Sequence, residues 1–261
     1  MPDPLISLTL QENYRKAMIG SIIVHLDRVD SSNNYAATEL LTKSLKEGTV
    51  FTASCQDAGR GQGNAVWESI PGLNLTLSIV LYPVQLEIAR QFSLSQAISL
   101  GVADFLAQFV GGVSVKWPND IYVYDKKIAG ILIETAISNG KFSNAIIGIG
   151  ININQEDFFS DAPNPVSLKN LTGENYDLTE TLNLLCDKLD KRYHSLITGN
   201  QRTIRSDYEQ LLCRKGIWAN YRDEVSDFVG KIIGVDQDGK LWIETRDGDA
   251  RGFYFKEVAF L

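Results

Sequence analysis

The sequence predicts a layered α/β or α+β domain that is followed by a small barrel of short strands. Three patterns carry this prediction. Over residues 73–81 apolar and polar side chains alternate with a period of two, which is typical of a strand with one face toward a core. Over residues 91–115 apolar side chains recur at helical spacing on one stripe. After Gly216 only short strand patterns remain. Strands mixed with helices in the first part indicate helices packed on a sheet.

The first part of the chain alternates strands with helices. Ser31 or Ser32 is expected to cap the first helix, because a hydroxyl accepts hydrogen bonds from the free amides of a helix N-terminus. The uncharged stretch at residues 69–86 contains two prolines and a glycine, which exclude a membrane-spanning helix. The expected elements are a strand at residues 21–26, a helix at 31–45, a strand at 49–56, a glycine-rich loop at 59–67, a strand at 73–81 and a helix at 91–115.

The middle of the chain is expected to complete the sheet. Two nearly continuous apolar runs, residues 128–135 and 145–153, are joined by a Ser-Asn-Gly turn and predict a hairpin buried on its helix side. Lys126 and Lys127 are expected in the turn before this hairpin. The remaining elements are short strands at residues 113–117 and 121–124 with a turn at 118–120, a surface loop at 154–167, and helices at 178–197 and 204–212.

Short strands dominate the last part of the chain. An Asp-Gly pair at residues 238–239 separates two strand patterns, which is the strongest short-range signal of a hairpin. Four or five strands in so short a segment are typical of a small barrel. We therefore expect two domains, with residues 1–212 forming the larger one and residues 213–261 forming the barrel.

The composition excludes several classes of protein. The 261 residues are 44% hydrophobic and 22% charged, which excludes a disordered chain. The net charge of −7 repels polyanions, so binding to DNA or to an anionic membrane would need a local basic patch. Three cysteines without a CxxC pair argue against a disulfide framework and a zinc site. The N-terminus lacks the pattern of a signal peptide, so the cytoplasm is the expected location.

The glycine-rich loop begins with the segment GRGQGN, residues 59–64. It lacks the Lys-Ser/Thr ending of a P-loop, and no helix of a dinucleotide-binding unit is expected after it. Its three glycines would let backbone amides approach an anion, and Arg60 adds a charge suited to phosphate or carboxylate. A plain flexible turn is the alternative interpretation of this segment alone.

Three further segments combine polar residues with strand or helix ends. In KWPND, residues 116–120, Pro118 forces the chain out of the sheet after Lys116, although a solvated lysine at a sheet edge is the alternative. In GIGININ, residues 148–154, glycines within an apolar strand often mark the close approach of a ligand, although a bulge is the alternative. For the segment DSSNNYA, residues 30–36, a plain helix cap is the alternative interpretation, because Ser and Asn are preferred at that position.

Taken together and in order, these segments resemble the motifs of the biotin protein ligase family, also called biotin–[acetyl-CoA-carboxylase] ligases. The resemblance runs from about residue 21 to residue 261. It rests on four segments of this chain, DSSNNYA, QDAGRGQGNAVW, KWPNDIYVYDKKIAGILIE and GIGININ, and on the C-terminal strands, which are similar to the family's SH3-like barrel. The resemblance implies an α+β fold, a mixed sheet with helices packed on it as in the class II synthetase-like biotin and lipoate ligases, plus that barrel.

The resemblance also implies an activity. In this family the biotin carboxylate attacks the α-phosphate of ATP to give biotinoyl-5'-AMP, and a lysine of a carboxylase's biotin carrier domain then displaces AMP. Biotin and ATP are thus substrates, and Mg²⁺ is expected to arrive with ATP. Both steps develop negative charge, so positioning and cationic stabilisation are needed and a protein nucleophile is not.

The site residues follow from the matched motifs. The catalytic candidates are Lys116 and Arg60. The residues expected to bind biotin are Ser32, Asn33, Gln56, Arg60, Gly61, Gln62, Lys116 and Gly130. Those expected to bind ATP are Arg60, Trp67, Lys116, Asn119, Asp120 and Asn152. No residue is expected to be a dedicated metal ligand.

Some features depart from the family pattern or leave alternatives. Gln62 stands where the family continues with further arginines, which predicts weaker retention of the adenylate. A lipoate or octanoyl ligase of the same fold and a non-catalytic biotin- or carrier-binding module remain alternatives. A bifunctional ligase and repressor is not expected, because about 20 residues before the first strand are fewer than the roughly 40 that an unaided folded domain needs. No nucleic-acid or membrane partner is therefore expected.

Overall fold

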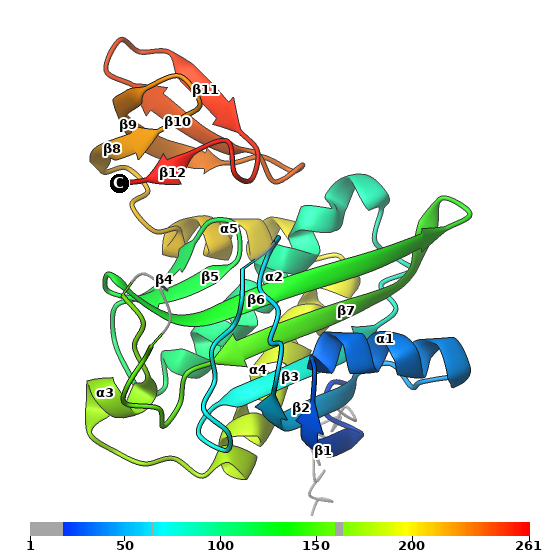
Figure 1. The fold of residues 1–261 in the computed structure, drawn as a ribbon. Helices are drawn as coiled ribbons and strands as arrows, with labels where there is room; N and C mark the ends of the chain where they lie inside the picture. Colours follow the sequence, from blue (N-terminus) through cyan, green and yellow to red (C-terminus); the bar gives the residue numbers. More distant parts are fainter. Residues whose placement is uncertain (1–17, 64, 160–163) are drawn as a thin grey trace, which may run out of the picture.

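The computed structural model describes residues 18–63, 65–159 and 164–261. A seven-stranded sheet carries helices on both faces, and a five-stranded sheet lies beyond one end of it (Figure 1). The predicted fold class, a mixed sheet with packed helices plus a C-terminal β unit, is confirmed. In chain order the elements are β1 (Ile23–Val29), α1 (Ser32–Thr42), β2 (Thr49–Gln56), β3 (Leu75–Leu81), the 3-10 helix η1 (Ile88–Arg90), α2 (Gln91–Leu106), β4 (Val113–Lys116), β5 (Asp120–Val123), β6 (Lys126–Ser138), β7 (Lys141–Ile151), α3 (Leu168–Thr172), α4 (Leu178–Ile197), α5 (Gln201–Leu211), β8 (Trp218–Arg222), β9 (Asp227–Val235), β10 (Leu241–Thr245), β11 (Ala250–Phe253) and β12 (Ala259–Phe260).

The large sheet has the strand order β1-β2-β3-β7-β6-β5-β4. Only β1 and β2 run parallel, and all other neighbours are antiparallel, so the sheet is mixed. The long hairpin of β6 and β7 crosses its centre, and Gly130 lies directly opposite Gly150 in that hairpin. Two facing glycines leave a strip of sheet surface without side chains, where another group can approach the backbone closely.

Strand β3 is buried on both faces, whereas the sequence predicted one apolar face. Its polar residues Thr76 and Ser78 are as buried as its leucines. The reason is that α1 covers the face that carries Ser78, whose Oγ donates a hydrogen bond to Asn33 Oδ1 and lies 2.8 Å from Ser32 Oγ of that helix. The opposite face of the sheet packs against α2, which in turn packs on α4 (Figure 1).

Several sequence predictions of boundaries and caps were wrong. Ser31 occupies the N-cap position of α1, but its side chain makes no capping hydrogen bond. Helix α2 ends at Leu106, well before residue 115. Lys126 and Lys127 belong to β6 rather than to a turn. The short helix α3 was not predicted, and Ser167 caps it by accepting a hydrogen bond from the Asn170 amide. Among the described residues, no helix is both long and apolar enough to span a membrane.

The C-terminal unit is an antiparallel sheet with the order β11-β10-β9-β8-β12. Its two edge strands are not paired with each other in the described part of the chain, so the sheet is open rather than a closed barrel. The Asp-Gly hairpin between β9 and β10 is confirmed, with Gly239 at a φ of 87°. The Trp117 indole N–H donates to the Gly239 carbonyl at 2.9 Å, which ties this hairpin to the large sheet. The boundary at residue 212 remains a prediction.

Replacing Trp117 with phenylalanine should loosen this junction. The change keeps an aromatic ring at a nearly buried position but removes the donor to the Gly239 carbonyl. We expect the free energy of unfolding in urea to fall by about 1 kcal/mol, the usual net value of a neutral hydrogen bond. An unfolding curve equal to that of the wild type would show that this hydrogen bond does not stabilise the junction.

Candidate active site

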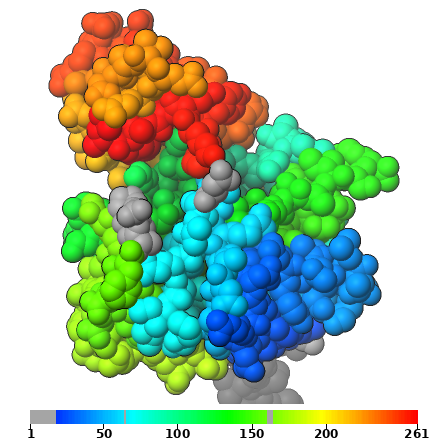
Figure 2. Space-filling model, in the orientation of Figure 1, coloured from blue at the N-terminus to red at the C-terminus, as the bar shows by residue number. Residues whose placement is uncertain are grey.

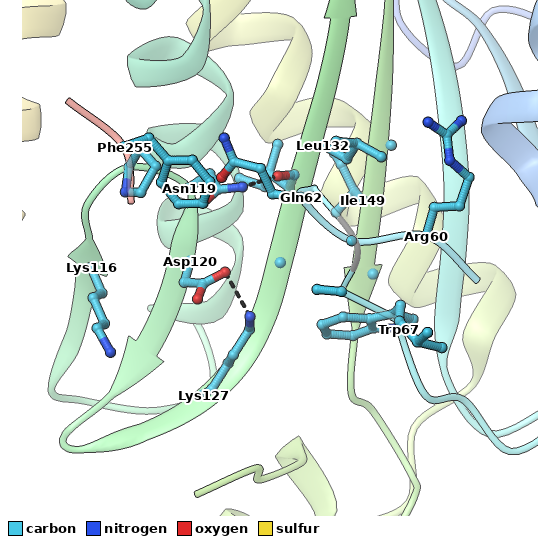
Figure 3. Close-up of a pocket in the computed structure, with 18 of the residues that line it drawn as sticks. Arg60, Gln62, Trp67, Lys116, Asn119, Asp120, Lys127, Leu132, Ile149 and Phe255 are labelled. Atoms are coloured by element: carbon cyan, nitrogen blue, oxygen red, sulfur yellow. Dashed lines mark hydrogen bonds and ion pairs between the residues drawn. The ribbon is translucent and has the colours of Figure 1, made fainter. Parts of the chain in front are cut away.

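A cavity of about 410 Å³ lies on the α1 side of the large sheet. The centre of the sheet forms its floor, the glycine-rich loop and the start of α1 form one wall, and the C-terminal unit forms another (Figure 3). With one exception, every site residue predicted from the sequence lines this cavity. The lining includes Ser32, Asn33, Gln56, Arg60, Gly61, Gln62, Trp67, Lys116, Asn119, Asp120 and Gly130.

The exception is Asn152, which is not among the lining residues. It is buried directly after β7, where its Nδ2 donates to the Val166 carbonyl at 3.1 Å. Its backbone amide also donates to the Ile128 carbonyl. These contacts make Asn152 a link between the floor of the site and the loop before α3. Its predicted role toward ATP remains a prediction.

The floor of the cavity depends on the absence of side chains at two glycines. The Trp67 indole lies over the facing pair Gly130 and Gly150. A Cβ built on Gly150 would lie 2.3 Å from Trp67 Cε2, and one on Gly130 would lie 3.0 Å from Trp67 Cζ3. Glycine is therefore needed at these two positions to leave room for the indole ring, and not for an unusual strand conformation. Trp67 Nε1 and Gln62 Oε1 are buried without a hydrogen-bond partner in the described structure, so both can serve a polar ligand.

Lys127 is a cation of the site that the sequence analysis did not assign. Its Nζ lies 2.7 Å from Asp120 Oδ1 and 5.9 Å from the centre of the Trp67 ring (Figure 3). A bulge places it there. Asp120 pairs with Gly130 and Tyr122 pairs with Lys127, so β6 carries one more residue than β5 between these pairs. The bulge therefore brings Lys127 onto the same face as Gly130.

Lys116 lines the same cavity but is directed elsewhere. Its Nζ donates to the Tyr122 hydroxyl at 3.3 Å and lies 5.2 Å from the centre of the Phe260 ring. In Figure 3 the side chain points away from the Asp120–Lys127 pair. Burial lowers the pKa of Lys116, and burial also raises the pKa of Tyr122 to about 12. The Lys116 ammonium is thus partly desolvated between β5 and the C-terminal unit.

Arg60 lies at the opposite end of the cavity from Lys116 (Figure 3). Its guanidinium pairs with Glu134, with 2.7 Å between Nη2 and Oε1, and it also donates to Asn34 Oδ1 at 2.8 Å. Glu134 and Asn34 were not predicted. Glu134 is in β6, four residues beyond Gly130 and therefore on the same face of the strand.

The start of α1 is connected to this ion pair by partly and fully buried hydrogen bonds. Asn33 Nδ2 donates to Glu134 Oε2 at 2.8 Å, while Asn33 Oδ1 accepts from Ser78 Oγ. The backbone amide of Ser32 donates to Gln56 Oε1 at 2.7 Å. Gly148 is needed here, because its Cβ would lie only 2.5 Å from Asn33 Oδ1. The residues predicted to contact a ureido ring are thus fixed together at one end of the cavity.

Asn119 and Asp120 lie at the sheet end nearer the C-terminal unit. The Asn119 amide group donates to the Ile131 carbonyl, and the Ile131 amide donates back to the Asn119 carbonyl at 3.1 Å. This exchange clamps the β4–β5 turn on β6 and leaves Asp120 facing the cavity. Of the described residues that line the cavity, Asp120 is the only one with a carboxylate side chain.

Comparisons with known proteins agree with this geometry. Residues 25–152 match the model of the biotin/lipoate A/B protein ligase family. The bifunctional ligase/repressor BirA of Bacillus spizizenii is 32% identical over 253 residues, which cover 95% of this chain and 77% of that protein. The chain belongs to the biotin protein ligase family. Another member, the biotin–[acetyl-CoA-carboxylase] ligase of Paracoccus denitrificans, is 30% identical over 83% of this chain and 91% of its own length.

The fold of the biotin protein ligase family extends over both units of the chain. The biotin protein ligase of Aquifex aeolicus, solved in complex with biotin and ATP, superposes with a TM-score of 0.77 at 25% identity. That match covers 92% of this chain and 99% of the other. The C-terminal sheet is therefore part of the shared architecture, in agreement with the sequence resemblance.

Proposed function

We propose that this protein is a biotin–protein ligase that attaches biotin to a lysine of a biotin carrier domain through biotinoyl-5'-AMP. The observation that carries the proposal is one cavity, which holds hydrogen-bonding side chains at one end and a lysine beside a glycine floor at its centre. The similar protein of Aquifex aeolicus was solved with both biotin and ATP. The carboxylate oxygen of biotin forms a bond to the α-phosphorus of ATP while pyrophosphate leaves. The carrier amine then bonds to the acyl carbon, and AMP leaves.

Each end of the cavity has a proposed task. Ser32, Asn33 and Gln56 bind the ureido ring, because a site built to hydrogen-bond polar groups rejects analogues that leave those groups unpaired. The valeryl chain packs against Trp67, whose indole rests on the glycine floor. Lys127 faces the carboxylate and the α-phosphate, where it stabilises the negative charge that develops during adenylation. Lys116 remains a candidate for the same task, but its contact with Tyr122 makes Lys127 better placed.

The nucleotide binds toward Asn119, Asp120 and the C-terminal unit. Mg²⁺ enters with the phosphates of ATP, since it commonly retains waters and uses few protein ligands. Among the described lining residues, Asp120 would be the one carboxylate ligand of Mg²⁺. To bind the ion, Asp120 would give up its ion pair with Lys127. We further propose a cytoplasmic location and a carboxylase carrier domain as the protein partner. The absence of a nucleic-acid partner remains a proposal from the net charge.

The decisive experiment is ATP–pyrophosphate exchange measured with biotin and with lipoate. Exchange that depends on biotin supports the proposal, while exchange with lipoate alone would establish the lipoate ligase instead. Biotin binding without exchange would indicate a non-catalytic biotin-binding module. A salt-sensitive, sequence-specific gel shift would overturn the expectation that DNA is not a partner.

Replacing Arg60 with alanine should reduce adenylate formation by about 10- to 100-fold, in line with the loss of charged hydrogen bonds. The guanidinium holds Glu134 and Asn34 at once, so Arg60→Lys should recover only part of the activity. Arg28→Ala is a matched control, because Arg28 forms an exposed ion pair with Asp57 away from the cavity lining. Full activity of Arg60→Lys would show that charge alone suffices.

A further inference from the structure

Four cationic side chains line the cavity, and three of them already have a partner within the protein. Arg60 pairs with Glu134, Lys127 pairs with Asp120, and Lys116 contacts the Tyr122 hydroxyl. The fourth is Lys256, in the turn between β11 and β12. Within the described ranges no carboxylate forms an ion pair with it, and its Nζ lies 5.8 Å from the centre of the neighbouring Phe255 ring. Lys256 thus brings an uncompensated positive charge to the cavity.

The turn holds Lys256 in an unusual backbone conformation. Its φ is 73°, which non-glycine residues rarely adopt because of the crowding of Cβ. The turn is closed by two hydrogen bonds, from the Glu257 amide to the Tyr254 carbonyl at 3.0 Å and from the Tyr254 amide to Glu257 Oε2 at 2.6 Å. Such conformations persist where the surroundings fix them, and they cluster at ligand sites. The side chain is therefore presented by a defined turn.

The lysine reaches the glycine-rich loop. A Cβ built on Gly63 would lie 2.6 Å from Lys256 Nζ, so the ammonium group rests directly against the loop backbone. Gly63 has a φ of 68°, which favours glycine at this point for a second reason. In Figure 2 the red residues near the C-terminus extend down toward the cyan segment that contains this loop. The two parts of the chain thus meet beside the cavity, which both Gln62 and Lys256 line.

We propose that Lys256 binds a phosphate oxygen of the bound nucleotide and of the adenylate, and so supplies the charge that Gln62 does not supply to the loop. This inference rests on the proposed function. A phosphate that replaces solvent at the ammonium group would hold the loop and the C-terminal turn together through one shared anion. Retention of the intermediate then depends on a cation from the C-terminal unit rather than on a second arginine within the loop.

The test compares the wild type with Lys256→Gln in three measurements: ATP binding by calorimetry, biotin binding by calorimetry, and the rate at which labelled biotinoyl-adenylate is released without a carrier. We expect ATP binding to weaken and release to accelerate by about tenfold each, the size of one lost charged hydrogen bond. Biotin binding should stay within twofold of the wild type, since the ureido end lies elsewhere. Lys231→Gln is the matched control, because Lys231 is in the same unit and pairs with Glu244.

A second variant separates charge from structure. Gln62→Arg places a cation in the loop, and in the Lys256→Gln background it should restore most of the lost ATP affinity and slow the release again. Unchanged ATP binding in Lys256→Gln would overturn the proposal, and so would an equal loss of biotin binding or a failure of Gln62→Arg to restore affinity. If the wild type binds ATP but shows no biotin-dependent exchange, the proposed function fails, and the phosphate contact is judged by ATP binding alone.

Discussion

Replacing Lys127 with alanine is expected to reduce biotin-dependent ATP–pyrophosphate exchange by about 100- to 1,000-fold, the usual cost of removing a group that stabilises developing charge. Its ammonium lies beside the glycine floor and the Trp67 ring, and its one ion pair, to Asp120, can be exchanged for a substrate anion. The loss should fall on the rate of adenylation more than on biotin binding, because the ureido end of the cavity is untouched. Initial rates over a range of biotin and ATP concentrations measure both effects.

Two matched variants make this prediction specific. Lys126 precedes Lys127 in β6 but is exposed and lies outside the cavity lining, so Lys126→Ala should retain wild-type exchange. Lys116→Ala should be less severe than Lys127→Ala, since Lys116 is directed to Tyr122 and the Phe260 ring. If Lys116→Ala removes exchange while Lys127→Ala does not, the catalytic cation is Lys116, as the sequence analysis proposed.

Replacing Gly150 with alanine should produce the second large effect. The added methyl group would lie 2.3 Å from Trp67 Cε2, and the strand behind it is fixed by pairing on both sides, so the indole has to move. We expect biotin affinity to weaken by about 10- to 100-fold, which lies within the 1 to 3 kcal/mol that overpacking usually costs. Calorimetric titration with biotin measures this change, and circular dichroism checks that the sheet remains folded.

Gly111→Ala is the control for that substitution. The nearest atom to a Cβ at this position is the Tyr124 hydroxyl at 3.9 Å, so the methyl group fits without displacing a neighbour. Its biotin affinity should equal that of the wild type. If Gly150→Ala also binds biotin with wild-type affinity, then the contact between Trp67 and the glycine floor has no part in the biotin site.

Much of the site could be predicted because its residues occur in contiguous motifs. Ser32 and Asn33 begin a helix, Gln56 ends a strand, and Asn119 with Asp120 follows a short strand, so local patterns placed them on elements, and the resemblance to the biotin protein ligase family assigned them to one site. Their convergence on one cavity follows from the pairing of the central strands.

The residues that were missed depend on long-range structure. Lys127 was expected in the turn before the hairpin, and the bulge that brings it onto the same face as Gly130 could not be recognised from the sequence. Glu134 ends the KWPNDIYVYDKKIAGILIE segment on which the resemblance rests, but no role was assigned to it, because its partners Arg60 and Asn33 are 74 and 101 residues away in sequence. Strand β3 was expected to have one buried face, but α1 covers the other, and packing between layers cannot be read from periodicity. The double burial of that strand needed the tertiary structure.

The shared cavity has a consequence for how the two steps of the reaction can be adjusted. One end is built from α1 and the sheet, and the other end is completed by Phe255, Lys256 and Phe260 of the C-terminal unit. Under the proposed function, changes in the C-terminal turns would alter how long the activated intermediate is retained before transfer to its acceptor, without altering which vitamin is selected. Sequence changes in the C-terminal unit among relatives, or an exchange of this unit between them, could change the rate of transfer to the acceptor independently of substrate selectivity.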